Sequence, residues 1–291
     1  MNAPVRRLTE PTWVRWTVIT FIVAWLSLFL VLPLVVVFHE ALAKGWQVYL
    51  ASFNDRATAH AIRLSLTVAA MAVVLNGVCG VSAAWLLTRF RFRGRQVLLS
   101  LIDLPFAVSP VIAGLVFVLL FGLQGYFGPW LRAHDVQILF ALPALVLSTV
   151  FVTFPFVVRE LIPVMEAVGT EEEEAARVLG AGGWAIFWRI TLPNVKWGLF
   201  YGVILCSARA MGEFGAVSVV SGHIRGATNT LPLHIEILYN EYQFAAAFAC
   251  ATLLSLFALV TLLIKEYVAW RQRVSLARAI QDHAPQPTSS H

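Results

Sequence analysis

The chain has 291 residues, of which 59% are hydrophobic and only 13% are charged, and its formal net charge is +5. Ordinary soluble domains carry about 25% charged residues, so the composition excludes a soluble globular protein. Long apolar runs indicate an all-α membrane protein. The basic residues are spread among the polar segments between apolar runs. This spread fits membrane orientation and gives no reason to expect a nucleic-acid partner.

The reactive residues give little support for enzyme chemistry. Cys79, Cys206 and Cys250 lie singly in apolar runs, and the histidines show no metal-ligand spacing. No Gly-Lys dipeptide occurs, so the chain has no phosphate-binding P-loop. We expect no metal, no cofactor and no disulfide, and we expect any ATP hydrolysis to belong to another subunit.

Apolar runs longer than the ~18 residues that suggest a membrane span predict six transmembrane helices. The first run is also longer than the ~7–15 residue core of a signal peptide, so we interpret it as a retained span. One membrane domain, residues 13–271, is expected between an N-terminal tail, residues 1–12, and a disordered C-terminal tail, residues 272–291. The six predicted spans are residues 14–38, 61–87, 97–121, 138–158, 198–220 and 244–267.

The third span contains helix-breaking residues. Asp103 is followed by Leu104 and Pro105, and Ser109 is followed by Pro110. Proline removes a backbone donor and clashes with the preceding turn, so the first half of this span is predicted to be kinked. The fourth span is predicted to end before Arg159.

The most charged segment is residues 169–193, which read GTEEEEAARVLGAGGWAIFWRITLP. Thr170 is predicted to cap a helix, with Glu173 completing a capping box. Arg177 is spaced to pair with Glu173 or Glu174 on the same helix. Gly180 is predicted to end the helix in the left-handed conformation, and a second short helix follows it. Pro193 is expected to end this unit or to open the next helix.

This segment resembles the "EAA" signature of ABC importer permeases, which reads Glu-Ala-Ala, three residues, Gly, nine residues, Ile-x-Leu-Pro. The resemblance implies six transmembrane helices in the type I importer permease fold, with this segment as a coupling helix that docks on a dimer of cytoplasmic ATPase subunits. The alternative is an amphipathic loop without a partner. The matching positions are Glu174, Ala175, Ala176, Gly180, Ile190, Leu192 and Pro193.

Arg209 and Glu213 are the charged residues predicted to lie within the fifth span. Arg209 is about 11 residues from the start of that span, which places it ~16 Å into a ~30 Å hydrocarbon core. Glu213 is one helical turn further on the same face. One interpretation is a structural ion pair; the other is that Arg209 offsets the charge of a passing dianion while Glu213 prevents tight binding.

Residues 208–242 carry a second resemblance, to permeases of the sulfate and molybdate branch, and most of all to the W-type permeases of sulfate/thiosulfate importers. The residues that carry it are Arg-Ala-x-Gly-Glu-Phe-Gly from Arg209, then Gly-His-Ile-Arg-Gly and Thr-Asn-Thr-Leu-Pro-Leu. This resemblance implies a T-type permease and a periplasmic sulfate- or thiosulfate-binding protein as further partners. Ser221, His223 and Arg225 are candidates for the translocation path. Their alternative role is to form turns and anchor an external loop.

The distribution of basic residues predicts the orientation. With six spans, the segments on the side of the N-terminus hold fifteen of the lysines and arginines, and the opposite segments hold five. By the positive-inside rule, we expect both termini and residues 169–193 on the cytoplasmic side. The resemblance to ABC importer permeases implies that the membrane is a bacterial inner membrane.

Three alternatives to a sulfate/thiosulfate permease stay open. The first is a molybdate or tungstate permease, which would be distinguished by the oxyanion that it transports. A self-sufficient secondary anion transporter or channel would not co-purify with an ATPase. A membrane enzyme would need a nucleophile with a base, or a metal cluster, in the spans, and the sequence contains no recognisable set of this kind.

Overall fold

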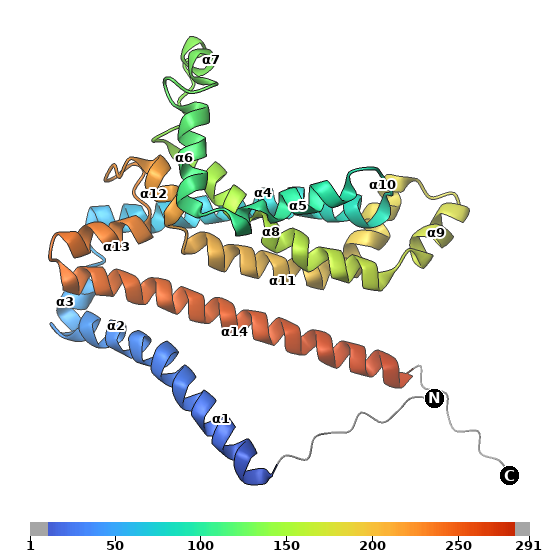
Figure 1. The fold of residues 1–291 in the computed structure, drawn as a ribbon, viewed down its shortest axis with the longest axis horizontal. Coiled ribbons are helices and arrows are strands. Elements are labelled where there is room, and N and C mark those ends of the chain that lie inside the picture. The colour runs from blue at the N-terminus through green and yellow to red at the C-terminus, as the bar shows by residue number, and fades with distance from the viewer. Residues whose placement is uncertain (1–10, 283–291) are drawn as a thin grey trace.

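The protein is described from residue 11 to residue 282 by a computed structural model, and within that range every regular element is a helix (Figure 1). Two of the elements, η1 and η2, are single π-helical turns inside longer helices. In chain order the elements are α1 (Thr12–Leu26), η1 (Ser27–Val31), α2 (Leu32–Leu42), α3 (Trp46–Ala51), α4 (Arg56–Arg89), α5 (Arg95–Ala107), α6 (Pro110–Phe121), α7 (Gly128–Ala133), α8 (Leu142–Val168), α9 (Glu171–Val178), α10 (Gly183–Ile186), η2 (Phe187–Thr191), α11 (Leu192–Met211), α12 (Gly215–Ser221), α13 (Leu231–Asn240) and α14 (Phe244–Asp282).

Helices α4, α8 and α11 pack side by side and form the core. Gly80 and Gly202 lie on either side of the fully buried Val157, so two helices approach α8 closely through residues without side chains. Asn76 is also buried here and donates to the Thr153 hydroxyl at 2.7 Å and to the Val150 carbonyl at 3.3 Å. Small residues and the hydrogen bonds donated by Asn76 thus hold the three helices together.

Two predicted spans are broken helices. The axes of α5 and α6 differ by 108° across Val108 and Ser109, and those of α11 and α12 differ by 53°. Because Pro110 opens α6 and cannot donate to the preceding helix, the kink predicted in the third span is a sharp break. Among residues 11–282, four helices are long and apolar enough to cross a membrane, and the number reaches six when each bent pair counts as one span.

Each π-helical turn lies directly before a Leu-Pro pair. The Leu32 N–H donates to the Ser27 carbonyl before Pro33, and the Leu192 N–H donates to the Phe187 carbonyl before Pro193. Proline has no N–H for the carbonyl four residues earlier. The widened turn lets the helix continue past it, so Pro193 lies in the first turn of α11.

Three predicted boundaries differ from the structure. Helix α8 continues past residue 158, the predicted end of the fourth span, through Arg159 to Val168. Helix α4 starts at Arg56, before the predicted residue 61, since the Asp55 carboxylate accepts from Thr58 N and caps the helix. The predicted tail boundary at residue 272 falls inside α14, while residues 1–10 and 283–291 of the two tails lie outside the described residues.

The bundle has two distinct ends (Figure 1). Residues 89–95 together with α9 and α10 form one end, which we call the basic end, and α3 and α13 lie at the opposite end. Helix α14 runs alongside α11 and α13, and α2 packs against its other side. The α1–α2 arm lies outside the core, and no side chain of α1 is buried.

Candidate functional site

Helix α9 and the turn after it project from the basic end. Val178 and Leu179 are each 88% exposed, and Trp184 on the following helix is 73% exposed. Gly180 has φ +86°, which confirms the predicted left-handed helix end. A short helix with an acidic first turn therefore presents the apolar side chains of Val178 and Leu179, beside Arg177, at its exposed end.

The side-chain pairing predicted within α9 is wrong. The Thr170 hydroxyl donates to Glu174 Oε1 at 2.7 Å and makes no cap hydrogen bond to the backbone. Glu173 completes no capping box, because its carboxylate binds Arg89 and Thr191. Arg177 has no ion pair among the described residues. Glu173 pairs with Arg89 and not with Arg177, because the nearly buried charge of Arg89 is less screened by solvent than the exposed charge of Arg177.

Arg89 is the residue of this site that sequence reasoning missed. Its Nε lies 3.0 Å from both Glu173 oxygens, its Nη1 donates to the Met165 carbonyl and its Nη2 donates to the Gly169 carbonyl. In the sequence it is one of four arginines at alternate positions, and this pattern indicates only the orientation of the chain in the membrane. Because Arg89 and Glu173 are 84 residues apart, no sequence spacing predicts that they pair.

The remaining positions of the signature lie at the junction with the membrane helices. Ile190 lies in η2, and Leu192 and Pro193 are the first residues of α11. The Thr191 hydroxyl donates to Glu173 Oε1 at 2.9 Å, and Asn194 donates to Glu172 Oε2 at 2.6 Å. These hydrogen bonds connect the start of α9 to the junction between η2 and α11.

Arg209 and Glu213 are brought together as predicted, but not on one helix face. Arg209 Nη1 lies 2.6 Å from Glu213 Oε2, an ion pair by distance without the directionality of a hydrogen bond. Glu213 follows the end of α11 and its Oε1 accepts from Ala216 N at 2.9 Å, so it caps α12. The Arg209 side chain is 33% exposed, whereas that of Glu213 is 1% exposed.

The other candidates for the path do not converge on this pair. Ser221 is buried at the end of α12, and its hydroxyl accepts from His223 N at 3.1 Å. His223 is exposed in a turn with φ +53°. Arg225 is bound to Glu241. These contacts are those of a folded turn.

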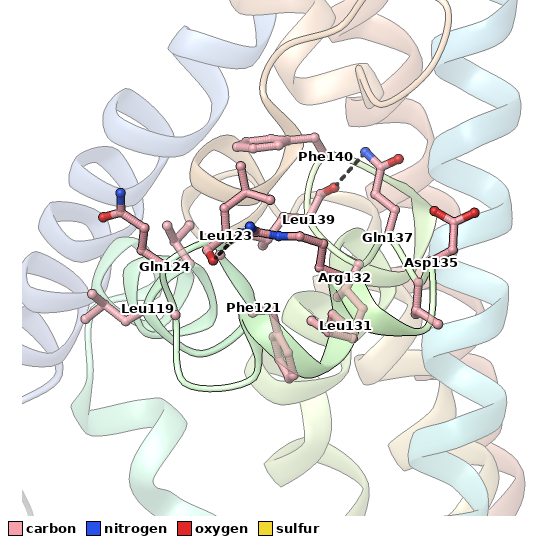
Figure 2. Close-up of a pocket in the computed structure, with 16 residues that line it drawn as sticks. Leu119, Phe121, Leu123, Gln124, Leu131, Arg132, Asp135, Gln137, Leu139 and Phe140 are labelled. Atoms are coloured by element: carbon pink, nitrogen blue, oxygen red, sulfur yellow. Dashed lines mark hydrogen bonds between the residues drawn. The ribbon is translucent and has the colours of Figure 1, made fainter.

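An open pocket of about 790 Å³ lies where α6 meets α7 (Figure 2). Arg132 donates to the Leu123 carbonyl at 3.0 Å, and Gln137 donates to the Leu139 carbonyl at 3.3 Å. None of the predicted path residues lines it. Its labelled polar groups are partly engaged in holding the loop between the two helices.

The geometry defines a class: an all-helical membrane protein with broken spans, an ion pair at one break and a projecting helix at one end. The family model described as "Binding-protein-dependent transport system inner membrane component" matches residues 76–274. The chain belongs to this family, which confirms the predicted ABC importer permease class and fold.

Curated relatives and solved structures agree with this family. The chain is 51% identical over 258 residues to the sulfate transport system permease protein CysW of Synechocystis, covering 89% of this chain and 94% of that protein. It is 50% identical to CysW of Escherichia coli and 37% identical to the sulfate permease CysT of that organism. A bacterial alginate ABC transporter chain matches with a TM-score of 0.74 at 17% identity, over 89% of this chain and 94% of that one.

Proposed function

We propose that this protein is the W-type permease subunit of an ATP-driven importer of sulfate and thiosulfate. The observation that carries the proposal is the identity of about half the residues, over nearly the whole chain, to proteins named as sulfate permeases. The lower identity to CysT favours the W-type subunit, with a T-type permease as its partner. A periplasmic sulfate- or thiosulfate-binding protein delivers the anion.

The coupling segment, residues 169–193, docks on a dimer of cytoplasmic ATPase subunits. Exposed apolar side chains at a defined surface mark interaction sites in proteins. Val178 and Leu179 form such a tip at the end of α9, next to the exposed Glu174. The chain has no P-loop of its own, so the partner hydrolyses ATP.

The orientation follows from the charge distribution. Both termini and the basic end lie in the cytoplasm, because fifteen of the basic residues belong to segments on that side and five to the other. In this orientation the docking tip faces the compartment that holds the ATPase. Reporter fusions after His134 and His291 test it: an external signal at His134 and a cytoplasmic one at His291 are expected.

Arg209 and Glu213 control the passage of the dianion. Ala210 and Met211, which lie between the two residues of the pair, pack against Ala69 of the 34-residue α4, and this contact supports a position within the membrane. A charge at this depth must face protein or water. Arg209 is partly exposed and can contact an anion, while Glu213 is fixed between α11 and α12 by its hydrogen bond to Ala216 N. Ser221, His223 and Arg225 belong to the external side of the path.

Purification from native membranes followed by reconstitution tests the function. An ATPase, a second permease and a binding protein should co-purify, and the reconstituted complex should take up sulfate when ATP and binding protein are present. Thiosulfate should compete for uptake. Uptake of molybdate or tungstate without sulfate would overturn the substrate, and purification without any ATPase would overturn the coupled importer.

A further inference from the structure

Arg89 and Glu173 form a buried ion pair at the basic end, where the membrane helices meet the coupling segment. Their side chains are 8% and 12% exposed, in contrast to the largely exposed pair of Arg95 and Glu166 nearby. Because both side chains are largely shielded from solvent, the attraction between their charges is less screened than at the surface. The pair is a fixed connection between the end of α4 and helix α9.

The guanidinium also closes the end of α8. Nη1 donates to the Met165 carbonyl at 3.0 Å and Nη2 donates to the Gly169 carbonyl at 2.7 Å. The last carbonyls of a helix have no partner within it. Arg89 therefore satisfies backbone acceptors at the end of α8 while its Nε holds the carboxylate of α9.

Helix α11 is the third membrane helix connected to this ion pair, through a hydrogen bond to Glu173. Thr191, which is buried, donates its hydroxyl to Glu173 Oε1 immediately before α11 begins. Glu172 is held by Asn194 in the first turn of α11. The Glu173 carboxylate and the Arg89 guanidinium thus together link α9 to α4, α8 and α11, the three helices of the core.

We propose that Arg89 and Glu173 are positioning residues that transmit movement between the ATPase-bound tip of α9 and the three core helices. The inference rests on the proposed function. Glu172 and Glu173 hold one side of α9 against the membrane helices, while Val178 and Leu179 lie exposed at its far end. Force on the tip reaches α4, α8 and α11 together as long as this joint is intact.

The test uses the complete importer in proteoliposomes. Arg89→Lys keeps the positive charge but replaces a planar fork of donors with a single ammonium, which cannot hold the carboxylate and both carbonyls in this geometry. Glu173→Gln keeps an acceptor for Thr191 and removes the charge. Arg91→Lys is the matched control, because Arg91 is exposed two residues away.

Three quantities are measured: the yield of assembled complex, ATP hydrolysis with and without binding protein, and anion taken up per ATP hydrolysed. Arg89→Lys and Glu173→Gln should assemble and hydrolyse ATP, while uptake per ATP falls at least about fivefold, the lower range of energetic coupling between sites. Arg91→Lys should match the wild type in all three.

Wild-type uptake per ATP in the assembled variants would overturn the proposal. Loss of assembly in both variants, with Arg91→Lys assembling normally, would also overturn it, because the pair would then serve only folding. If the wild type imports another oxyanion, the proposed substrate fails alone, and the same ratio measured with that anion decides the role of the joint.

Discussion

Gly80 of α4 and Val157 of α8 are so close that a Cβ at position 80 would lie 2.7 Å from Val157 Cγ1. On the other side of Val157, a Cβ at Gly202 of α11 would lie 3.2 Å from the Val157 Cα. Helices in membranes associate mainly through close packing, which small residues allow. The contact between α4, α8 and α11 therefore depends on the absence of side chains at two positions.

Gly80→Val should destabilise the protein by about 1–3 kcal/mol, the typical cost of overpacking a core. The thermal unfolding midpoint of the detergent-solubilised protein measures this loss. Gly77→Ala is the control, because a Cβ there would meet nothing within 4 Å. Alanine is also the better helix former, so this variant should be as stable as the wild type or more so. Equal stability of Gly80→Val and the wild type would contradict the close contact.

Gly180→Leu should uncouple ATP hydrolysis from uptake while the protein stays in the membrane. Leucine in the left-handed conformation costs about 1–2 kcal/mol, and relief of that strain redirects the turn after α9. Gly45→Leu is the control for strain at a positive φ, since the two glycines have φ of +86° and +90° and open space around them. Gly45 lies outside the coupling segment, so its variant should keep wild-type uptake per ATP. Equal uptake per ATP in both variants would argue against a role for the Gly180 turn.

The double variant Arg209→Met with Glu213→Gln removes both charges at similar volume. If the pair controls the anion, the complex should assemble and its ATPase should respond to binding protein, but sulfate uptake should fall sharply. Arg209→Met alone should reduce assembly, since an unpaired buried carboxylate costs about 3–5 kcal/mol. Normal uptake through a normally assembled double variant would leave the pair with a structural role only.

His234 on α13 should make stability depend on pH. Burial lowers the pKa of this histidine below 6.5, and Arg225 lowers it further, against the opposing effects of Asp55 and Glu241. At a pH between this lowered pKa and 6.5, the histidine binds more protons in the unfolded chain than in the folded protein. The stability that depends on the neutral His234 is therefore fully present above pH 6.5 and falls as the pH falls below it.

The unfolding midpoint of the wild type should therefore decrease from neutral pH toward pH values below 6.5. His234→Gln should flatten this decrease, because the side chain that meets the Thr58 hydroxyl at 3.0 Å no longer titrates. His134→Gln, at an exposed position, should keep the wild-type dependence. An unchanged slope in His234→Gln would contradict the assignment.

The sequence predicted features that depend on local chemistry. Apolar runs locate the membrane helices because hydrocarbon tolerates few charges over a whole span. Gly180 was predicted to be left-handed from its place after an apolar stripe, and its φ confirms this. The proximity of Arg209 and Glu213 followed from their spacing, which brings side chains together even where the helix ends between them.

Features that depend on distant residues were missed. The partner predicted for Glu173 was its neighbour Arg177, whereas the structure pairs it with Arg89, 84 residues earlier. The spacing within α9 could not show that the end of α4 reaches this helix. Likewise, Pro110 indicated a kink, but the bend of 108° depends on the packing of α6 against α12.

The exposed α1 has a consequence for the synthesis of the chain. None of its side chains is buried by the rest of the molecule, and the Thr12–Leu42 helix is the most apolar of the candidate spans. A helix satisfies its own backbone hydrogen bonds, so in hydrocarbon it needs no neighbour to be stable. Because α1 leaves the ribosome before α4, α8 and α11, it can settle in the bilayer before these helices exist as a core.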